Sequence, residues 1–137
     1  MAIEIIEIAR LFFSGISAAA SAIGVWQKSR DKKKAAKEFD EKFEEIKKSS
    51  EAQEAAVELL NSIPNDVIKD LEARADRCWT SYRKVLGGEF LPDEVDDATE
   101  AVQACVCREL GRIYKLNGEI PRRWQRQWNR YNCKKKH

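Results

Sequence analysis

The sequence predicts an all-α protein, a helical bundle in which a long N-terminal helix or helix pair is followed by a compact three-helix unit. The chain of 137 residues contains only 6 Gly and 3 Pro, too few for an all-β fold that turns about every ten residues. Apolar residues recur instead at spacings of three and four, which is the period of an amphipathic helix. The length fits one domain of ordinary size.

The composition excludes several classes of protein. Charged residues make up 35% of the chain and hydrophobic residues 43%, which argues against a wholly disordered chain and against a polytopic membrane protein. The net charge of +2 argues against a generally basic nucleic-acid binder, although local clusters of charge remain.

Residues 1–27 predict a membrane-associated apolar helix. Residues 11–27 carry no charge, and this length lies at the lower edge of what spans a bilayer, for which about 20 apolar residues are needed. The basic run KSRDKKK follows at once, a bias that keeps this end of a membrane helix, and here the bulk of the chain, cytoplasmic. The side chains expected to contact lipid are Leu11, Phe12, Phe13, Ile16, Ile23 and Trp26.

Small residues in the same segment predict close helix packing. Gly15, Ala18, Ala19 and Ala22 fall at helical spacing, and such ladders let helix backbones approach closely inside a membrane. We expect Gly15→Leu or Ala19→Leu to disrupt assembly by overpacking this contact. The alternative is that an Ala-rich helix packs tightly in the core of a soluble bundle.

Residues 28–62 predict a charged helix with a heptad pattern, free of Gly and Pro and rich in Lys, Glu and Ala. A break near residues 29–31 is equally compatible with the sequence, because Asp31 can cap a second helix. The heptad positions form either a seam between copies of the chain or the inner face of an ordinary bundle helix. The apolar residues of this predicted seam are Phe39, Phe43, Ile46, Val57 and Leu60.

Residues 63–137 predict the compact helical unit with a basic, aromatic tail. Pro64 marks the start of its first helix and Gly87-Gly88 the end. Pro92 and the acidic run after it begin the second helix, and Pro121 begins the last.

The four cysteines predict buried thiols in a reducing cytoplasm. Cys105 and Cys107 lie two apart on a helix and face different ways, and no CxxC pair exists, so a zinc site with Cys78 and Cys133 is disfavoured. Disulfides are disfavoured too if the basic side faces the cytoplasm. We therefore expect no metal, no cofactor and no small-molecule substrate.

Arg130 and His137 are the weak candidates for a catalytic pair. The segment RYNCKKKH resembles the Arg-x(4–6)-His signature of HEPN ribonucleases, in which the Arg stabilises phosphate charge and the His does acid–base work. His137 is the only histidine and the last residue of the sequence, and acid–base catalysis needs positioned groups. We therefore expect no enzymatic activity.

The tail interleaves basic and aromatic residues. Nucleic acid is a possible partner because cations neutralise phosphates and aromatics stack on bases, and an anionic lipid surface suits the same composition. The third interpretation is structural: Trp124, Trp128 and Tyr131 share one helix face, which would bury against Trp79, Tyr82 and Ile113. The residues that would contact nucleic acid are Arg122, Arg123, Arg126, Trp124 and Trp128.

Taken together, an inserting helix, a heptad seam and a helical unit are similar in layout to small helical membrane effectors of bacterial immunity. These include the accessory membrane protein of type VI-B CRISPR systems, and HeLo-like cell-death proteins share the layout. The resemblance implies a homo-oligomeric pore or membrane-perturbing complex in a defence or cell-death role. The alternatives are a soluble all-α adaptor that oligomerises through its heptad seam and a HEPN-like ribonuclease.

Overall fold

The computed structural model describes residues 4–136 and confirms the all-α prediction. Six helices form a compact bundle, a one-turn helix follows them, and no strand occurs in this range. The helices are α1 (Ile5–Ser29), α2 (Lys32–Lys47), α3 (Ser50–Ser62), α4 (Asn65–Gly87), α5 (Pro92–Asn117), α6 (Arg122–Arg130) and α7 (Cys133–Lys136).

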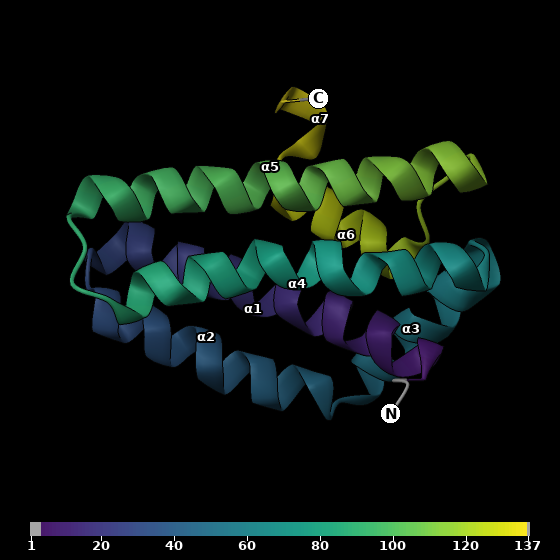
Figure 1. The fold of residues 1–137 in the computed structure, drawn as a ribbon, viewed down its shortest axis with the longest axis horizontal. Coiled ribbons are helices and arrows are strands. Elements are labelled where there is room, and N and C mark those ends of the chain that lie inside the picture. The colour runs from purple at the N-terminus through teal and green to yellow at the C-terminus, as the bar shows by residue number, and fades with distance from the viewer. Residues whose placement is uncertain (1–3, 137) are drawn as a thin grey trace.

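Helix α1 is the centre of the bundle. It lies between α2 and α4 (Figure 1), and it contacts every helix from α2 to α6. The three segments distinguished in the sequence therefore contribute to a single core. A helix surrounded by other helices buries most of its circumference and is apolar there, which accounts for the absence of charge from residues 11–27.

Helix boundaries follow the expected local signals. Arg30 adopts a left-handed conformation with φ of 55°, and the Asp31 carboxylate then caps α2 by accepting a hydrogen bond from the Lys34 amide at 3.2 Å. The sequence left two alternatives open here, a continuous helix and a break near residues 29–31, and the structure has the break. Pro64 precedes α4, and Gly118 ends α5 with φ of 84°, a conformation that glycine adopts without strain.

The prediction of one uninterrupted helix over residues 28–62 is wrong. Helix α2 ends at Lys47 and α3 begins at Ser50. The Ser49 hydroxyl accepts a hydrogen bond from the Ala52 amide at 3.2 Å, so a serine cap ends one helix and starts the next without any Gly or Pro. The heptad stripe is thereby divided between two helices that both pack on α1.

Candidate functional site

The apolar helix α1 is the candidate functional element. It is the one helix within residues 4–136 that is long and apolar enough to cross a membrane, and 67% of its most apolar window is buried inside the bundle. Core helices of soluble proteins and N-terminal signal sequences share these properties. Five of the six side chains expected to contact lipid are buried in the fold, and Leu11 is half-buried; the five are Phe12, Phe13, Ile16, Ile23 and Trp26.

The small residues of α1 contact other helices of the same chain. Gly15 lies beneath the Trp79 indole so closely that a Cβ atom there would lie 2.7 Å from Trp79 Cε3 and closer still to Cδ2 and Cε2. Ala18, Ala19 and Ala22 are likewise fully enclosed. The buried faces that α2 and α3 contribute to this core are also rich in alanine: Ala35, Ala36, Ala52, Ala55 and Ala56.

Helix α6 and the turn after it hold the middle of α1 through polar contacts. The Tyr131 hydroxyl donates to the Ile16 carbonyl at 2.6 Å, and the Gln127 amide donates to the Ser17 hydroxyl at 3.1 Å. Burial raises the pKa of Tyr131 above its ordinary value, so this phenol remains a hydrogen-bond donor at neutral pH. These contacts form a clasp across α1.

A second polar contact anchors the C-terminal end of α1. The Trp26 indole N–H donates to Asp96 Oδ1 at 2.8 Å, and Arg30 forms an ion pair with the same oxygen at 2.5 Å. The hydrogen bond from Trp26, followed by that from Arg30, lowers the pKa of Asp96 below its ordinary value. Trp26 is therefore tied to the N-terminal part of α5.

This carboxylate predicts an acid-sensitive contribution to stability. Since the folded-state pKa of Asp96 is lowered, the contribution is present above the unfolded-state pKa of about 4 and is lost as pH falls through the lower folded-state value. We expect Asp96→Asn to lower the melting temperature at pH 7, and the difference from wild type to shrink as the pH falls below the ordinary carboxyl pKa of about 4. Calorimetry of both proteins from neutral to acid pH checks this, and a constant difference would contradict it.

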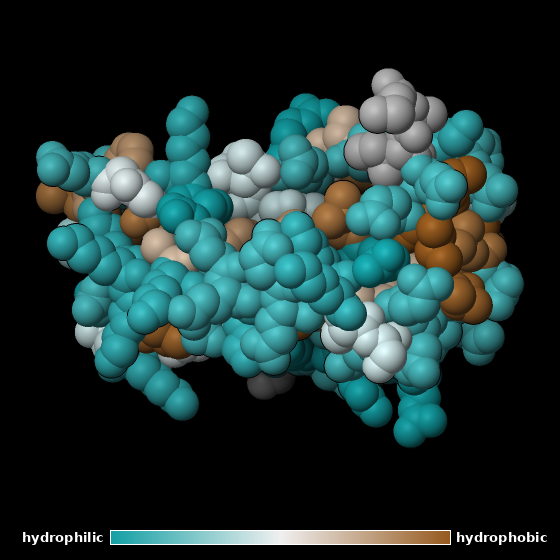
Figure 2. Space-filling view, turned by 90° about the horizontal axis from the view of Figure 1, so that it is seen from below, coloured by the Kyte–Doolittle hydropathy of each residue, from teal (hydrophilic) through white to brown (hydrophobic). Residues whose placement is uncertain are grey.

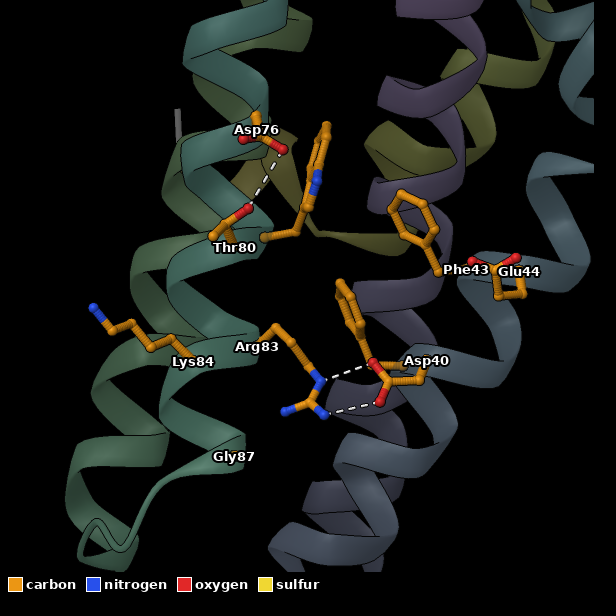
Figure 3. A pocket seen from close by; sticks show the side chains of 10 residues that line it. Asp40, Phe43, Glu44, Asp76, Thr80, Arg83, Lys84 and Gly87 are labelled. Carbon is orange, nitrogen blue, oxygen red and sulfur yellow. Dashed lines mark hydrogen bonds and ion pairs between the residues drawn. The ribbon is translucent and has the colours of Figure 1, made fainter.

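A groove of about 600 Å³ opens between α2 and α4 beside α1. Figure 3 shows Arg83 reaching from α4 to Asp40 on α2, where Nε and Nη2 donate to the two carboxylate oxygens at 2.7 and 2.8 Å. Phe39 and Trp79 line the same groove. Since Trp79 also covers Gly15, only side chains separate α1 from solvent along the line where α2 meets α4, called here the α2–α4 seam.

The predicted oligomer seam takes part in the intramolecular packing. Phe39 is buried, with its ring 6.0 Å from that of Phe43 and 6.5 Å from that of Tyr82. Ile46 and Leu60 are half-buried against the same core. Val57 is 42% exposed, so it is the member of the set most open to a second copy.

The basic tail is largely engaged within the chain. Trp124 is buried between the rings of Phe12 and Phe13, each 5.3 Å away, and its indole donates to the Ala55 carbonyl at 2.9 Å. The expected burial of this face is confirmed for Trp124 and Tyr131, although Trp124 stacks on α1 aromatics rather than on the predicted Trp79.

The arginines expected to contact nucleic acid differ in their surroundings. Arg123 forms ion pairs with Glu54 and Glu58 on α3, and Arg126 lies 3.9 Å from Glu51. Arg122 is exposed. Trp128 is half-buried and lines a different groove, between α5 and α6.

The structure describes only one member of the weak catalytic pair, Arg130. Arg130 is exposed and donates to the Ser21 hydroxyl at 3.2 Å. His137 lies outside the described residues, so the structure gives this pair no geometry.

The expectation of free thiols is wrong. Cys78 on α4 pairs with Cys105 on α5, and Cys107 on α5 pairs with Cys133 on α7. The prediction that Cys105 and Cys107 face different ways is confirmed, because each pairs with a cysteine on a different helix. Disulfides are typical of oxidising compartments, so they argue against a cytoplasmic location for the bulk of the chain.

Residues 4–136 contain no group of His, Cys, Asp or Glu side chains that is able to hold a metal ion.

Two features of this site had weak signals in the sequence. The contact of Gly15 with Trp79 joins residues 64 positions apart, and neither residue is marked by its neighbours. The Asp96 anchor lies in an acidic helix start that a favourable helix dipole already explains.

The chain matches no known family model, no curated protein sequence and no solved structure.

Proposed function

We propose that this protein is a self-assembling membrane-acting bundle whose apolar helix α1 is stored in the core and inserts into a bilayer once the bundle opens. The observation that carries the proposal is α1 itself, with 25 residues and 17 consecutive positions without charge. At 1.5 Å per residue the helix is about 37 Å long, enough for a hydrocarbon layer of about 30 Å.

The packing of α1 supports storage and release. The buried residues of α2 and α3 are mostly alanines, and burying alanine removes less apolar surface from water than burying leucine. Small-residue interfaces depend on close van der Waals packing, which also operates in lipid. The same ladder can therefore hold α1 in the bundle and pack α1 helices from several copies together in a membrane.

In the closed bundle, most of the apolar surface of α1 is buried away from solvent. The face seen in Figure 2 is mostly hydrophilic, with apolar residues gathered toward the end where α1 begins. Insertion therefore requires the bundle to open, for which the α2–α4 seam is the simplest route. Separation of α2 from α4 there breaks the Asp40–Arg83 ion pair, and exposed ion pairs contribute little to stability. Opening also frees Phe43 and Ile46 for contacts between copies.

The second candidate is a soluble all-α adaptor. The observation that favours it is the burial of α1, because enclosure by five helices explains an apolar helix without any membrane. Removing α1 would also remove the centre of the core, so truncation does not discriminate between the two functions. A single charged residue, introduced at a position where the folded bundle tolerates it, does discriminate between the two functions.

Ser21→Asp is that substitution. In the folded bundle the new carboxylate faces Arg130, which already contacts the Ser21 hydroxyl at 3.2 Å, so we expect a melting temperature close to wild type. In a membrane the same carboxylate lies near the middle of the uncharged stretch, where it costs about 2.5–3.5 kcal/mol. We therefore expect Ser21→Asp to abolish both partition into carbonate-washed membranes and dye release from anionic vesicles.

Gln27→Asp is the matched control, since it adds the same charge at the exposed end of the stretch. It should partition and release dye like wild type. The adaptor function is correct instead if wild type remains in the soluble fraction and releases no dye even under conditions that open the bundle. Dye release by Ser21→Asp at the wild-type rate would also overturn the insertion of α1.

A further inference from the structure

A groove on the far side of the bundle from α2 collects positive charge. It lies between α5, α6 and the start of α7, and its volume is about 850 Å³. Four of its lining residues are cationic and none of the described lining residues is acidic. The cationic residues are Arg108, Arg112, Lys115 and Lys134.

These charges are poorly compensated within the chain. Arg112 lies 3.9 Å from Glu109, a carboxylate that Arg74 also approaches at 3.6 Å. The other three cations form no ion pair with any residue in the described range. Arg108, Arg112 and Lys115 are three or four positions apart on α5, a spacing at which like charges repel and destabilise the helix. This repulsion lowers the stability of the folded protein, and an anion bound in the groove would reduce the repulsion.

Gly111 leaves open space at the centre of this groove. It lies inside α5 among these three cations, although glycine is the least favourable helix residue after proline. A Cβ atom there would meet nothing within 4 Å, so no close packing requires the glycine. Its effect is to keep the floor of the groove open.

The groove also has uncharged lining residues, on α6 and on α5. Gln125 and the half-buried Trp128 project from α6, and Tyr114 on α5 is 54% exposed. The disulfide between Cys107 and Cys133 fixes the start of α7 against α5, which places Lys134 at the groove. The lining is thus cations around an open floor, flanked by an amide and two aromatic rings.

We propose that this groove binds the phosphate group of a phosphorylated compound, with Trp128 and Tyr114 contacting the group that carries the phosphate. Arginine and lysine are the side chains that bind phosphate through charge-assisted hydrogen bonds. The phosphate belongs either to a soluble phosphate ester or to an anionic lipid headgroup. The inference is independent of whether α1 inserts.

The test measures binding of two probes to the full-length, disulfide-bonded protein. Inorganic pyrophosphate is titrated by calorimetry, and vesicles of phosphatidylcholine with a minority of phosphatidic acid are used in co-sedimentation. We expect the triple substitution Arg108→Gln, Lys115→Gln and Lys134→Gln to lower the affinity for the probe that binds by at least about tenfold. The matched control is Lys37→Gln, Lys69→Gln and Lys84→Gln, which removes the same charge elsewhere and should bind like wild type.

Gly111→Leu is the second variant. It fills the groove without changing the net charge, so it distinguishes binding in the groove from a general effect of positive charge. Its side chain enters open space, so the fold should be retained or become more stable while binding falls. Binding of pyrophosphate assigns a soluble ester, and binding of vesicles alone assigns a lipid headgroup. The proposal is overturned if wild type binds neither probe, if the control triple loses as much as the groove triple, or if Gly111→Leu binds like wild type. Tighter binding of a single-stranded oligonucleotide that depends on Arg122 and Arg126 would also overturn it.

Discussion

Gly15→Ala should destabilise the wild-type protein and stabilise a variant in which Trp79 has been truncated. In the wild type the added Cβ would lie 2.7 Å from Trp79 Cε3 and nearer to two other ring carbons. Alanine is favoured over glycine in a helix by about 1 kcal/mol, but overpacking of a rigid indole costs about 1–3 kcal/mol and occasionally more. Since three ring atoms clash at once, we expect a net loss, seen as a fall in melting temperature of about 5–10 °C.

The reversal of sign identifies the cause. Trp79→Leu alone should lower stability by a few kcal/mol through loss of buried aromatic surface. In that background the space above Gly15 opens, so Gly15→Ala should add up to about 1 kcal/mol. Gly24→Ala is the matched control, because a Cβ atom at Gly24 meets nothing within 4 Å and the substitution should stabilise in both backgrounds. Equal losses from Gly15→Ala with and without Trp79 would contradict the contact.

The same variants separate a contact within the chain from one between copies. Gly15→Leu was expected from the sequence to disrupt assembly, and the structure gives Gly15 an intramolecular partner in Trp79. We therefore expect Gly15→Leu to unfold the bundle before it changes the size of any oligomer. Thermal melts and gel filtration of one preparation measure both, and a smaller oligomer with an unchanged melting temperature would place Gly15 between copies.

The fold was predictable where a single residue carries the local signal. Pro64 acts through its own ring, so the start of α4 was predicted, and the carboxylate of Asp31 indicated the break before α2 as one of two alternatives. The break at Ser49 was missed because serine competes for backbone hydrogen bonds only weakly, and the helix formers around it favour continuation.

The candidate site was less predictable because one pattern has two physical origins. An apolar helix with a terminal tryptophan describes both a membrane span and the central helix of a bundle. Only the positions of the other helices show that Trp26 is tied to Asp96 in the fold. The cysteine pairs were missed for a related reason: helix packing sets their Cα separations of 5.8 and 5.2 Å, and the basic flank of α1 had favoured a reducing compartment.

Reduction of both disulfides should remove a large part of the stability. The pairs close two loops that do not overlap, with sequence separations of 27 and 26 residues. By the chain-entropy relation each loop restrains the unfolded state by about 3.5 kcal/mol at 25 °C. Together they reach about 7 kcal/mol, against a typical total of about 5–15 kcal/mol for a domain. Urea unfolding with and without a thiol reductant measures the difference. Alkylation of the urea-unfolded protein without reductant should label none of the four cysteines, and labelling there would contradict the pairing.

The two disulfides should differ in their effect on α1 although they contribute similarly to stability. Cys107 and Cys133 anchor the chain directly after Tyr131, whose hydroxyl holds the Ile16 carbonyl. Cys78 and Cys105 join α4 to α5 and leave this clasp in place. We therefore expect the double substitution Cys107→Ala and Cys133→Ala to increase vesicle partition more than Cys78→Ala and Cys105→Ala, once the denaturant midpoints of the two variants are matched by temperature. Equal partition at equal stability would mean that α1 is released by global unfolding and that the clasp has no separate part in it.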